Sequence, residues 1–182
     1  AAFTFKNGWW LLFFALVPLF CAVLGTRLAY RRFLRIIFLF SLSCYVPLMM
    51  WLLKIGAVLP FSKKTSAIIL ILCTVLVGLL QGAYIAAATI FFVRIRTGKS
   101  RDVLSFSFLF ILGEWLQEVT PVLPFPWARI GVMAVPFTPF IQSASLFGSL
   151  FISLLILIIN GGVAFFIINR RTLKKALFSA AF

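Results

Sequence analysis

The residues that could carry chemistry in this chain are few, and two of them lie close together. The sequence contains three acidic residues and no histidine, so it lacks the commonest general base and the commonest metal ligand of proteins. Glu114 and Glu118 are four residues apart and share one face of a continuing helix. An acidic residue within an apolar helix indicates a function or a specific partner. We therefore expect Glu114 to contact a ligand, with a structural role left open, whereas a solvated position is the competing interpretation for Glu118.

The three cysteines add no obvious nucleophile. Cys21, Cys44 and Cys73 each fall inside an apolar run, where a thiol behaves as a small hydrophobic group and a disulfide has no geometric support. We therefore predict no metal site, no cofactor and no catalytic residue carried by this chain alone.

A proline-rich stretch follows the two glutamates. It holds five of the eight prolines, namely Pro121, Pro124, Pro126, Pro136 and Pro139. Each proline lacks an amide donor and disfavours helical geometry in its predecessor, so we predict an irregular loop over 120–139. The loop is strongly apolar, and we expect it to lie on or dip into the outer leaflet of a membrane as a rim for lipid entry. The candidate substrate-binding residues are Glu114, Phe125, Pro126, Trp127 and Arg129, with Arg129 placed to meet a phosphate.

Composition places the surrounding elements in a membrane. Of the 182 residues 64% are apolar and 11% are charged, whereas soluble proteins are roughly half apolar and a quarter charged. The net charge of +14 is embedded in apolar sequence, which argues against a soluble enzyme and against nucleic-acid binding. We predict a single all-α integral membrane domain, a bundle of about five to six transmembrane helices. The expected spans are 8–26, 33–53, 66–93, 103–119 and 140–168, followed by the opening of a sixth or surface-lying helix.

The basic residues predict how the bundle is oriented. Twelve of the 17 follow the first, third and fifth spans: Arg27, Arg31, Arg32, Arg35, Arg94, Arg96, Lys99, Arg101, Arg170, Arg171, Lys174 and Lys175. Lys and Arg are retained on the cytoplasmic side of a membrane. We therefore expect the amino terminus and the connections at 54–65 and 119–139 on the outer face, with anionic lipid headgroups balancing the basic clusters.

Small residues predict where helices approach closely. Gly78, Gly82 and Ala86 recur every four positions on the third span, and Ser145, Ser149 and Ser153 do so on the fifth. Such faces let membrane helices pack backbone to backbone. We expect both faces to serve bundle packing, and a polar groove for a lipid headgroup is the alternative.

The order of these motifs resembles a known family. Glu114-Trp115-Leu116 precedes Phe125-Pro126-Trp127, Gly131, two further prolines and a helix that contains Gly148, while Trp9-Trp10 and Arg31-Arg32 flank the first span. This pattern resembles the membrane domain of the bacterial apolipoprotein N-acyltransferases. The resemblance extends over nearly the whole chain and is specific around 114–131.

The resemblance implies a location and a function. The family transfers an acyl chain from a phospholipid, through an enzyme thioester, to the amino group of the diacylglyceryl cysteine that begins a lipoprotein in the bacterial inner membrane. Its catalytic Glu, Lys and Cys belong to a nitrilase-like domain outside the membrane, and no residue of this chain matches them. The chain would then present phospholipid and lipoprotein to a nitrilase-like domain that is separate or missing here, with 114–127 forming part of the portal.

This sequence also departs from the family pattern. Gln117 and Glu118 stand where the family usually has Arg-Gly, and Pro124, Val132 and Val135 replace a glycine, a tyrosine and an aspartate. Two interpretations of these changes are open. The chain is either part of a divergent enzyme or a shortened relative that acts as a non-catalytic membrane subunit or lipid-binding scaffold. A transporter is a third alternative, disfavoured because the spans hold almost no charge. A native gene that continues into a Glu, Lys and Cys constellation would favour the enzyme.

Overall fold

The computed structural model describes residues 9–25, 29–49, 60, 62–120, 124 and 129–180, and at positions 9, 48, 49 and 171–180 it describes the backbone alone. These residues form helices and turns and no strand, which confirms the all-helical fold class. In chain order the elements are η1 (Trp9–Leu11), α1 (Leu12–Ala15), α2 (Val17–Leu24), α3 (Tyr30–Met49), α4 (Lys63–Thr89), α5 (Phe92–Ile95), α6 (Arg101–Val119), η4 (Ile130–Ala134), α7 (Thr138–Ile141), α8 (Ala144–Phe147) and α9 (Ser149–Ala180).

Two helical segments are long and apolar enough to cross a bilayer. They are Lys63–Ile95 and Ser149–Arg170, and Leu12–Leu24 is a shorter apolar segment. The helix α6 coincides with the expected fourth span but carries Arg101, Asp102, Glu114 and Glu118, so it is less apolar than the other two. A count of five to six crossings therefore stays a prediction.

The long helix expected over 140–168 begins later in the structure than the sequence predicted. Gly148 has φ 79° and ψ 168°, a conformation that ends α8 and that residues with a Cβ rarely adopt. The long helix α9 begins only at Ser149, so Ser145 lies outside it. At its other end α9 continues to Ala180, so residues 177–180 prolong this helix instead of opening a sixth one.

The first apolar segment is divided into α1 and α2 at Leu16. The Leu16 N–H would ordinarily donate to the Leu12 carbonyl, but the amide of Asn160 on α9 lies between them. Leu16 donates to Asn160 Oδ1 (2.9 Å), and Asn160 Nδ2 donates to the Leu12 carbonyl (2.8 Å). A side chain inserted into the helical hydrogen-bond ladder breaks a helix without leaving its polar groups unpaired. Pro18 follows in the first turn of α2, where a missing amide donor is tolerated.

The core of the bundle contains an aromatic cluster around Phe106 of α6. Phe20, Phe33, Phe92 and Phe110 surround it edge to face, with ring centroids 5.3, 6.5, 5.2 and 6.1 Å from the Phe106 centroid. All five side chains are buried. Edge-to-face packing is the favoured geometry of aromatic pairs, so Phe106 joins α2, α3, α5 and α6 into one unit.

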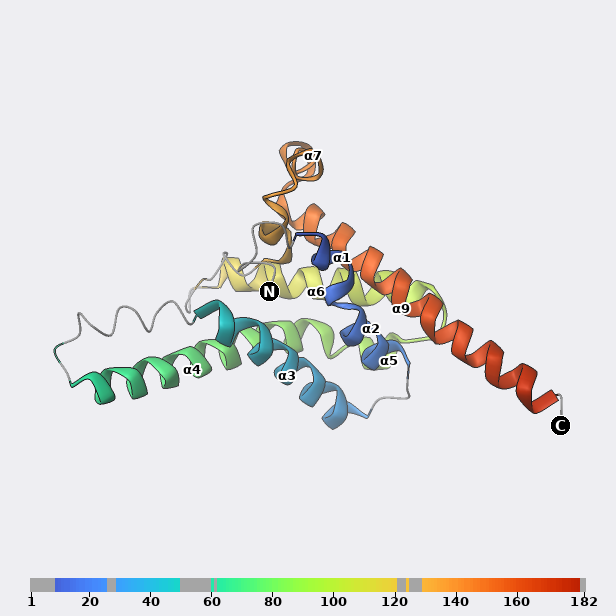
Figure 1. Ribbon diagram of the computed structural model, residues 1–182, viewed down its shortest axis with the longest axis horizontal. Coiled ribbons are helices and arrows are strands. Elements are labelled where there is room, and N and C mark those ends of the chain that lie inside the picture. The colour runs from blue at the N-terminus through green and yellow to red at the C-terminus, as the bar shows by residue number, and fades with distance from the viewer. Residues whose placement is uncertain are drawn as a thin grey trace.

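Small residues allow the long helices to approach closely, as the sequence predicted for α4. An ideal Cβ on Gly82 of α4 would lie 2.8 Å from the Ser41 Cβ on α3, and one on Gly113 of α6 would lie 2.9 Å from the Ile85 Cα on α4. The helices thus pack in the order α3, α4, α6 and α9, and α9 also covers α2 (Figure 1). The helices α6 and α9 therefore lie side by side, and the candidate site lies between them and η4.

The described parts of the basic clusters meet at one end of the bundle. Arg96, after α5, donates to the Leu24 carbonyl at the end of α2, and Arg94 Nε donates to the Tyr30 hydroxyl (2.7 Å) at the beginning of α3. Ile168 of α9 packs against the core near the end of α2. The proline-rich segment follows the opposite end of α6 (Figure 1). The basic residues and the proline-rich segment thus lie at opposite ends of the bundle, as the alternation of basic and non-basic connections along the sequence predicted.

Candidate functional site

Glu114 is buried where α6, η4 and α9 meet. It is 2% exposed, and its Oε1 accepts a 2.9 Å hydrogen bond from the Ile130 N–H. Its Oε2 is buried as well and has no hydrogen-bond partner among the described residues. Loss of the Ile130 contact would leave a second buried carboxyl oxygen unpaired, at a cost of about 1–3 kcal/mol. Glu114 therefore fixes the beginning of η4 against the last turns of α6.

Gly131 holds η4 against α9. Its N–H donates to Ser153 Oγ at 2.8 Å, and an ideal Cβ on Gly131 would lie 2.7 Å from the Ser149 carbonyl oxygen. Only a residue without a side chain fits this approach to the α9 backbone. Of the three serines predicted to form one face of the fifth span, Ser149 and Ser153 lie on α9. These two residues contact η4.

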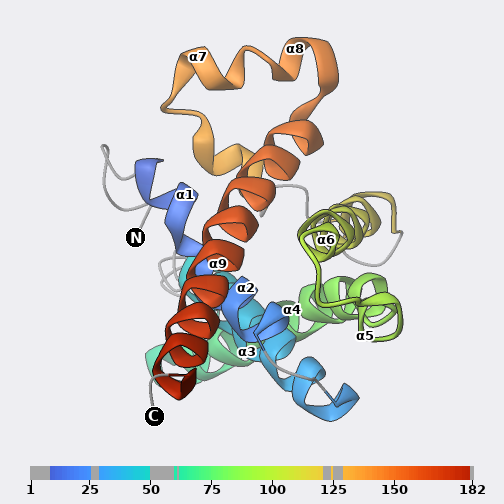
Figure 2. The same ribbon diagram turned by 90° about the vertical axis from the view of Figure 1, so that its right-hand side faces the viewer.

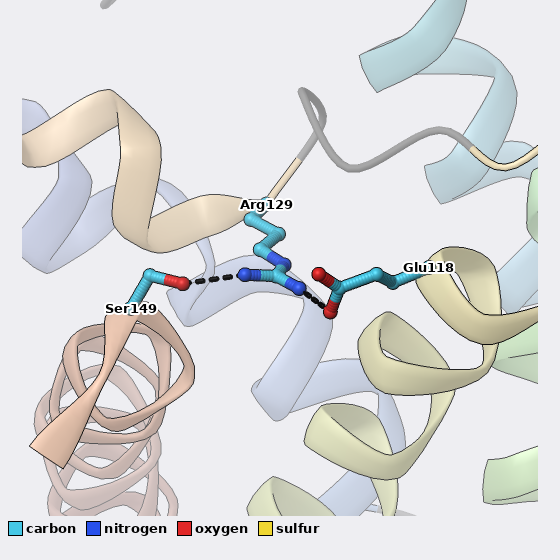
Figure 3. Close-up of polar contacts among 3 residues, drawn as sticks. All are labelled: Glu118, Arg129 and Ser149. Atoms are coloured by element: carbon cyan, nitrogen blue, oxygen red, sulfur yellow. Dashed lines mark hydrogen bonds and ion pairs between the residues drawn. The ribbon is translucent and has the colours of Figure 1, made fainter.

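Arg129 closes the same cluster from the solvent side. Its guanidinium forms an ion pair with Glu118 at the end of α6 and donates to Ser149 Oγ at the beginning of α9 (Figure 3). The Arg129 side chain is 11% exposed and that of Glu118 is 44% exposed. Arg129 Nε is buried and has no hydrogen-bond partner in the described part of the chain. Glu118 is therefore partly solvated, as one of its two interpretations expected, and it also forms an ion pair with Arg129.

Gln117 connects the site helix to the rest of the bundle. It is buried, and its Nε2 donates to the Tyr45 hydroxyl on α3 (2.7 Å) and to the Gln81 carbonyl on α4 (3.1 Å). Hydrogen bonds to polar groups inside an apolar bundle fix the rotation of a helix, because a turned helix would leave them unpaired. Gln117 therefore helps to keep Glu114 directed at η4.

An apolar arch lies next to the cluster. The short helices α7 and α8 follow η4 and project beyond the beginning of α9 (Figure 2). Val135, Leu146 and Phe147 are exposed on this part of the chain. Exposed apolar side chains gathered beside a polar cluster are typical of a surface that meets lipid or another protein.

The structure brings together part of the predicted site. Glu114 and Arg129 contact η4 and its neighbours in one cluster, whereas Phe125, Pro126 and Trp127 lie outside the described residues. The role of Gly131 as the seat of η4 was missed, although a glycine in an apolar stretch is a signal of close backbone approach. The buried Asn160 was missed as well, although it is a single amide within a long apolar run.

The cluster is suited to positioning a segment or a ligand. Among the described residues no three or more His, Cys, Asp and Glu gather at one place, and the three cysteines are free thiols. The polar groups at the site are two carboxylates, one guanidinium and two hydroxyls, most of them engaged with one another. Such an arrangement holds the backbone of η4 in place between α6 and α9.

Comparison with known families identifies the family to which these elements belong. The family described as apolipoprotein N-acyltransferase N-terminal domain matches residues 1–162. Comparisons with curated proteins and with solved structures give no match. The family match spans most of the chain and includes α6, η4 and the first turns of α9, the elements that build the cluster. The chain therefore belongs to the apolipoprotein N-acyltransferase N-terminal domain family, as the motif order indicated.

Proposed function

We propose that this chain is the membrane domain of a lipoprotein N-acyltransferase in the bacterial inner membrane, and that it presents two lipid substrates to a nitrilase-like catalytic domain. The donor is a phospholipid and the acceptor is a diacylglyceryl lipoprotein. The segment 120–139, with Glu114, Phe125, Pro126, Trp127 and Arg129, forms the rim of a lateral portal on the outer face.

One observation carries the proposal, namely that α6 and α9 hold η4 from both sides. Glu114 binds the Ile130 amide, Gly131 binds Ser153, and Arg129 bridges the ends of the two helices. Held in this way, η4 is a preformed edge of the portal. A preformed edge suits the positioning of substrates, because binding in a fixed orientation turns a reaction between two diffusing molecules into a reaction between neighbouring groups.

Two further features support lipid entry from the outer leaflet. The exposed apolar arch of α7 and α8 stands beside the edge and offers contacts to acyl chains. The basic clusters gather at the opposite end of α6, and such clusters mark the cytoplasmic side of membrane proteins. The edge then faces the compartment in which lipoproteins carry their free amino group.

A crosslinking experiment tests whether the chain binds the acceptor. A diacylglyceryl lipopeptide with a photoreactive acyl chain is added to proteoliposomes that contain the chain. We expect crosslinking that unlabelled diacylglyceryl lipopeptide displaces and that the same peptide without lipid does not. Arg129→Met should lower the yield by about fivefold, the effect of one charge-assisted contact. The matched control is Lys64→Met, which removes an exposed positive charge from the beginning of α4.

The outcomes separate the candidate functions. Displaceable crosslinking that Arg129→Met weakens and Lys64→Met leaves unchanged supports the portal. Crosslinking to phospholipid without any specific capture of lipopeptide would favour a lipid-binding scaffold of a larger complex. Equal yields for the wild type and both variants would show that the cluster at Arg129 does not contribute to substrate binding.

A further inference from the structure

A small open cavity lies at the other end of the molecule, away from the proposed portal. It is an open cavity of about 190 Å³ between the first turn of α3 and the junction of α4 and α5. Its lining residues are Tyr30, Ile90, Phe91 and Arg94. None of them belongs to the cluster around Glu114, so this cavity needs an explanation of its own.

The polar wall of the cavity presents hydrogen-bond donors. Arg94 Nε donates to the Tyr30 hydroxyl at 2.7 Å, and the guanidinium carbon lies 6.0 Å from the centroid of the Tyr30 ring. These contacts fix the guanidinium plane, while its two terminal nitrogens have no hydrogen bond or ion pair with the described residues. The Tyr30 hydroxyl also retains its own proton to donate. A fixed arginine fork with free terminal nitrogens matches the oxygens of a phosphate.

The charge around the cavity is positive and uncompensated. Exposed basic residues follow the lining residues along the chain, on the first turns of α3 and around the beginning of α6: Arg31, Arg32, Arg35, Lys99 and Arg101. The acidic residue described at this end, Asp102, is buried, and its carboxylate accepts hydrogen bonds from the amides of Thr97 and Gly98. Asp102 therefore holds the turn before α6 and is not available to Arg94. A ligand with a net negative charge is favoured, because it is attracted by the whole cluster.

The other wall of the cavity is apolar. Ile90 lines it, and Phe91 is 53% exposed. Ile95, one turn further along α5, is also exposed. Phosphate donors beside an apolar strip match a ligand with an anionic headgroup and a hydrocarbon chain, and a free phosphate would use only one wall.

We propose that this cavity binds an anionic phospholipid of the leaflet at the basic end of the bundle. Arg94 and Tyr30 bind its phosphate, and one acyl chain lies along Phe91. The binding does not depend on the proposed portal, because the two places share no residue and lie at opposite ends of α6.

Lipid titration of the purified, delipidated chain tests this site. Phosphatidylglycerol in detergent micelles is titrated against the chain, and binding is followed by native mass spectrometry, with phosphatidylcholine as the neutral reference. We expect preference for phosphatidylglycerol, and a loss of affinity of about tenfold in Arg94→Met. Tyr30→Phe should give a smaller loss in the same direction. Arg35→Met is the matched control, because it removes an equal charge from exposed α3 surface outside the cavity.

Each result decides for or against the site. A loss in Arg94→Met and in Tyr30→Phe, with Arg35→Met close to wild type, supports it. Equal losses in Arg94→Met and Arg35→Met would show diffuse attraction to a basic surface and overturn it. Displacement of the lipid by millimolar inorganic phosphate or glycerophosphoglycerol would overturn the lipid assignment in favour of a soluble phosphate. Melting curves recorded without lipid confirm that the variants compared are folded.

Discussion

Replacement of Gly131 by alanine tests the position of η4 against α9. An ideal Cβ at this position would lie 2.7 Å from the Ser149 carbonyl oxygen and 3.0 Å from the Ser153 amide nitrogen. Both are backbone atoms of α9, so neither can turn aside as the end of a side chain could. The segment η4 must therefore move outward. This movement stretches the 2.8 Å bond from Gly131 to Ser153 and the 2.9 Å bond from Ile130 to Glu114.

The magnitude follows from these two effects. Overpacking a well-packed contact costs about 1–3 kcal/mol, and a buried hydrogen-bonding group left unpaired costs about 1–3 kcal/mol. Outward movement relieves the clash at the expense of the hydrogen bonds, so the costs do not add in full. We expect Gly131→Ala to lower the free energy of unfolding by about 2–4 kcal/mol.

Unfolding by sodium dodecyl sulfate, followed by tryptophan fluorescence in mixed micelles, measures this loss. Gly162→Ala on α9 is the control, because an added Cβ there meets nothing within 4 Å. Alanine in a helix is favoured over glycine by about 1 kcal/mol, so this variant should be neutral or slightly stabilised. If Gly131→Ala has the same free energy of unfolding as Gly162→Ala, η4 does not pack on α9 as described, and the reasoning is refuted.

Two further substitutions test how buried polar groups hold the bundle. Asn160→Leu leaves the amide and the carbonyl at the break between α1 and α2 unpaired and should cost about 2–4 kcal/mol in the same unfolding assay; stability equal to that of the wild type would contradict the inserted amide. Asp102→Ala should speed tryptic cleavage after Lys99, because the turn before α6 loses its acceptor, whereas Asp102→Asn keeps an acceptor oxygen and should be cleaved more slowly than the alanine variant. Identical cleavage rates in the two variants would argue against this role.

The positions of the long helices could be predicted from the sequence, but their breaks could not. Hydropathy and basic clusters place α3, α4 and α6 within a few residues of the predicted spans. The break at Leu16 depends on Asn160, which is 144 residues away along the chain, so no local pattern announces it. The break at Gly148 depends on a positive φ at a residue that the predicted fifth span placed inside a helix.

The candidate site was predictable in its residues more than in its contacts. Glu114 stands out because a carboxylate in an apolar helix needs a reason to be there. Its partner is the backbone amide of Ile130, and backbone groups leave no mark in residue types. The pairing of Glu118 with Arg129 crosses a stretch of prolines, where periodicity does not indicate which residues meet. Three-dimensional packing of α6 against α9 decides both contacts.

We propose that the segment 120–139 is a rim that admits lipid acyl chains at the outer face. A phospholipid with a photoreactive acyl chain, placed in the outer leaflet of right-side-out vesicles, tests it directly when the crosslinked peptides are mapped by mass spectrometry. We predict crosslinks within 120–139 that a diacylglyceryl lipopeptide displaces, alongside crosslinks on the exposed face of α4, at Ile68 and Leu72, that it does not displace. Crosslinks confined to α4, or equally displaced at both places, would contradict the account.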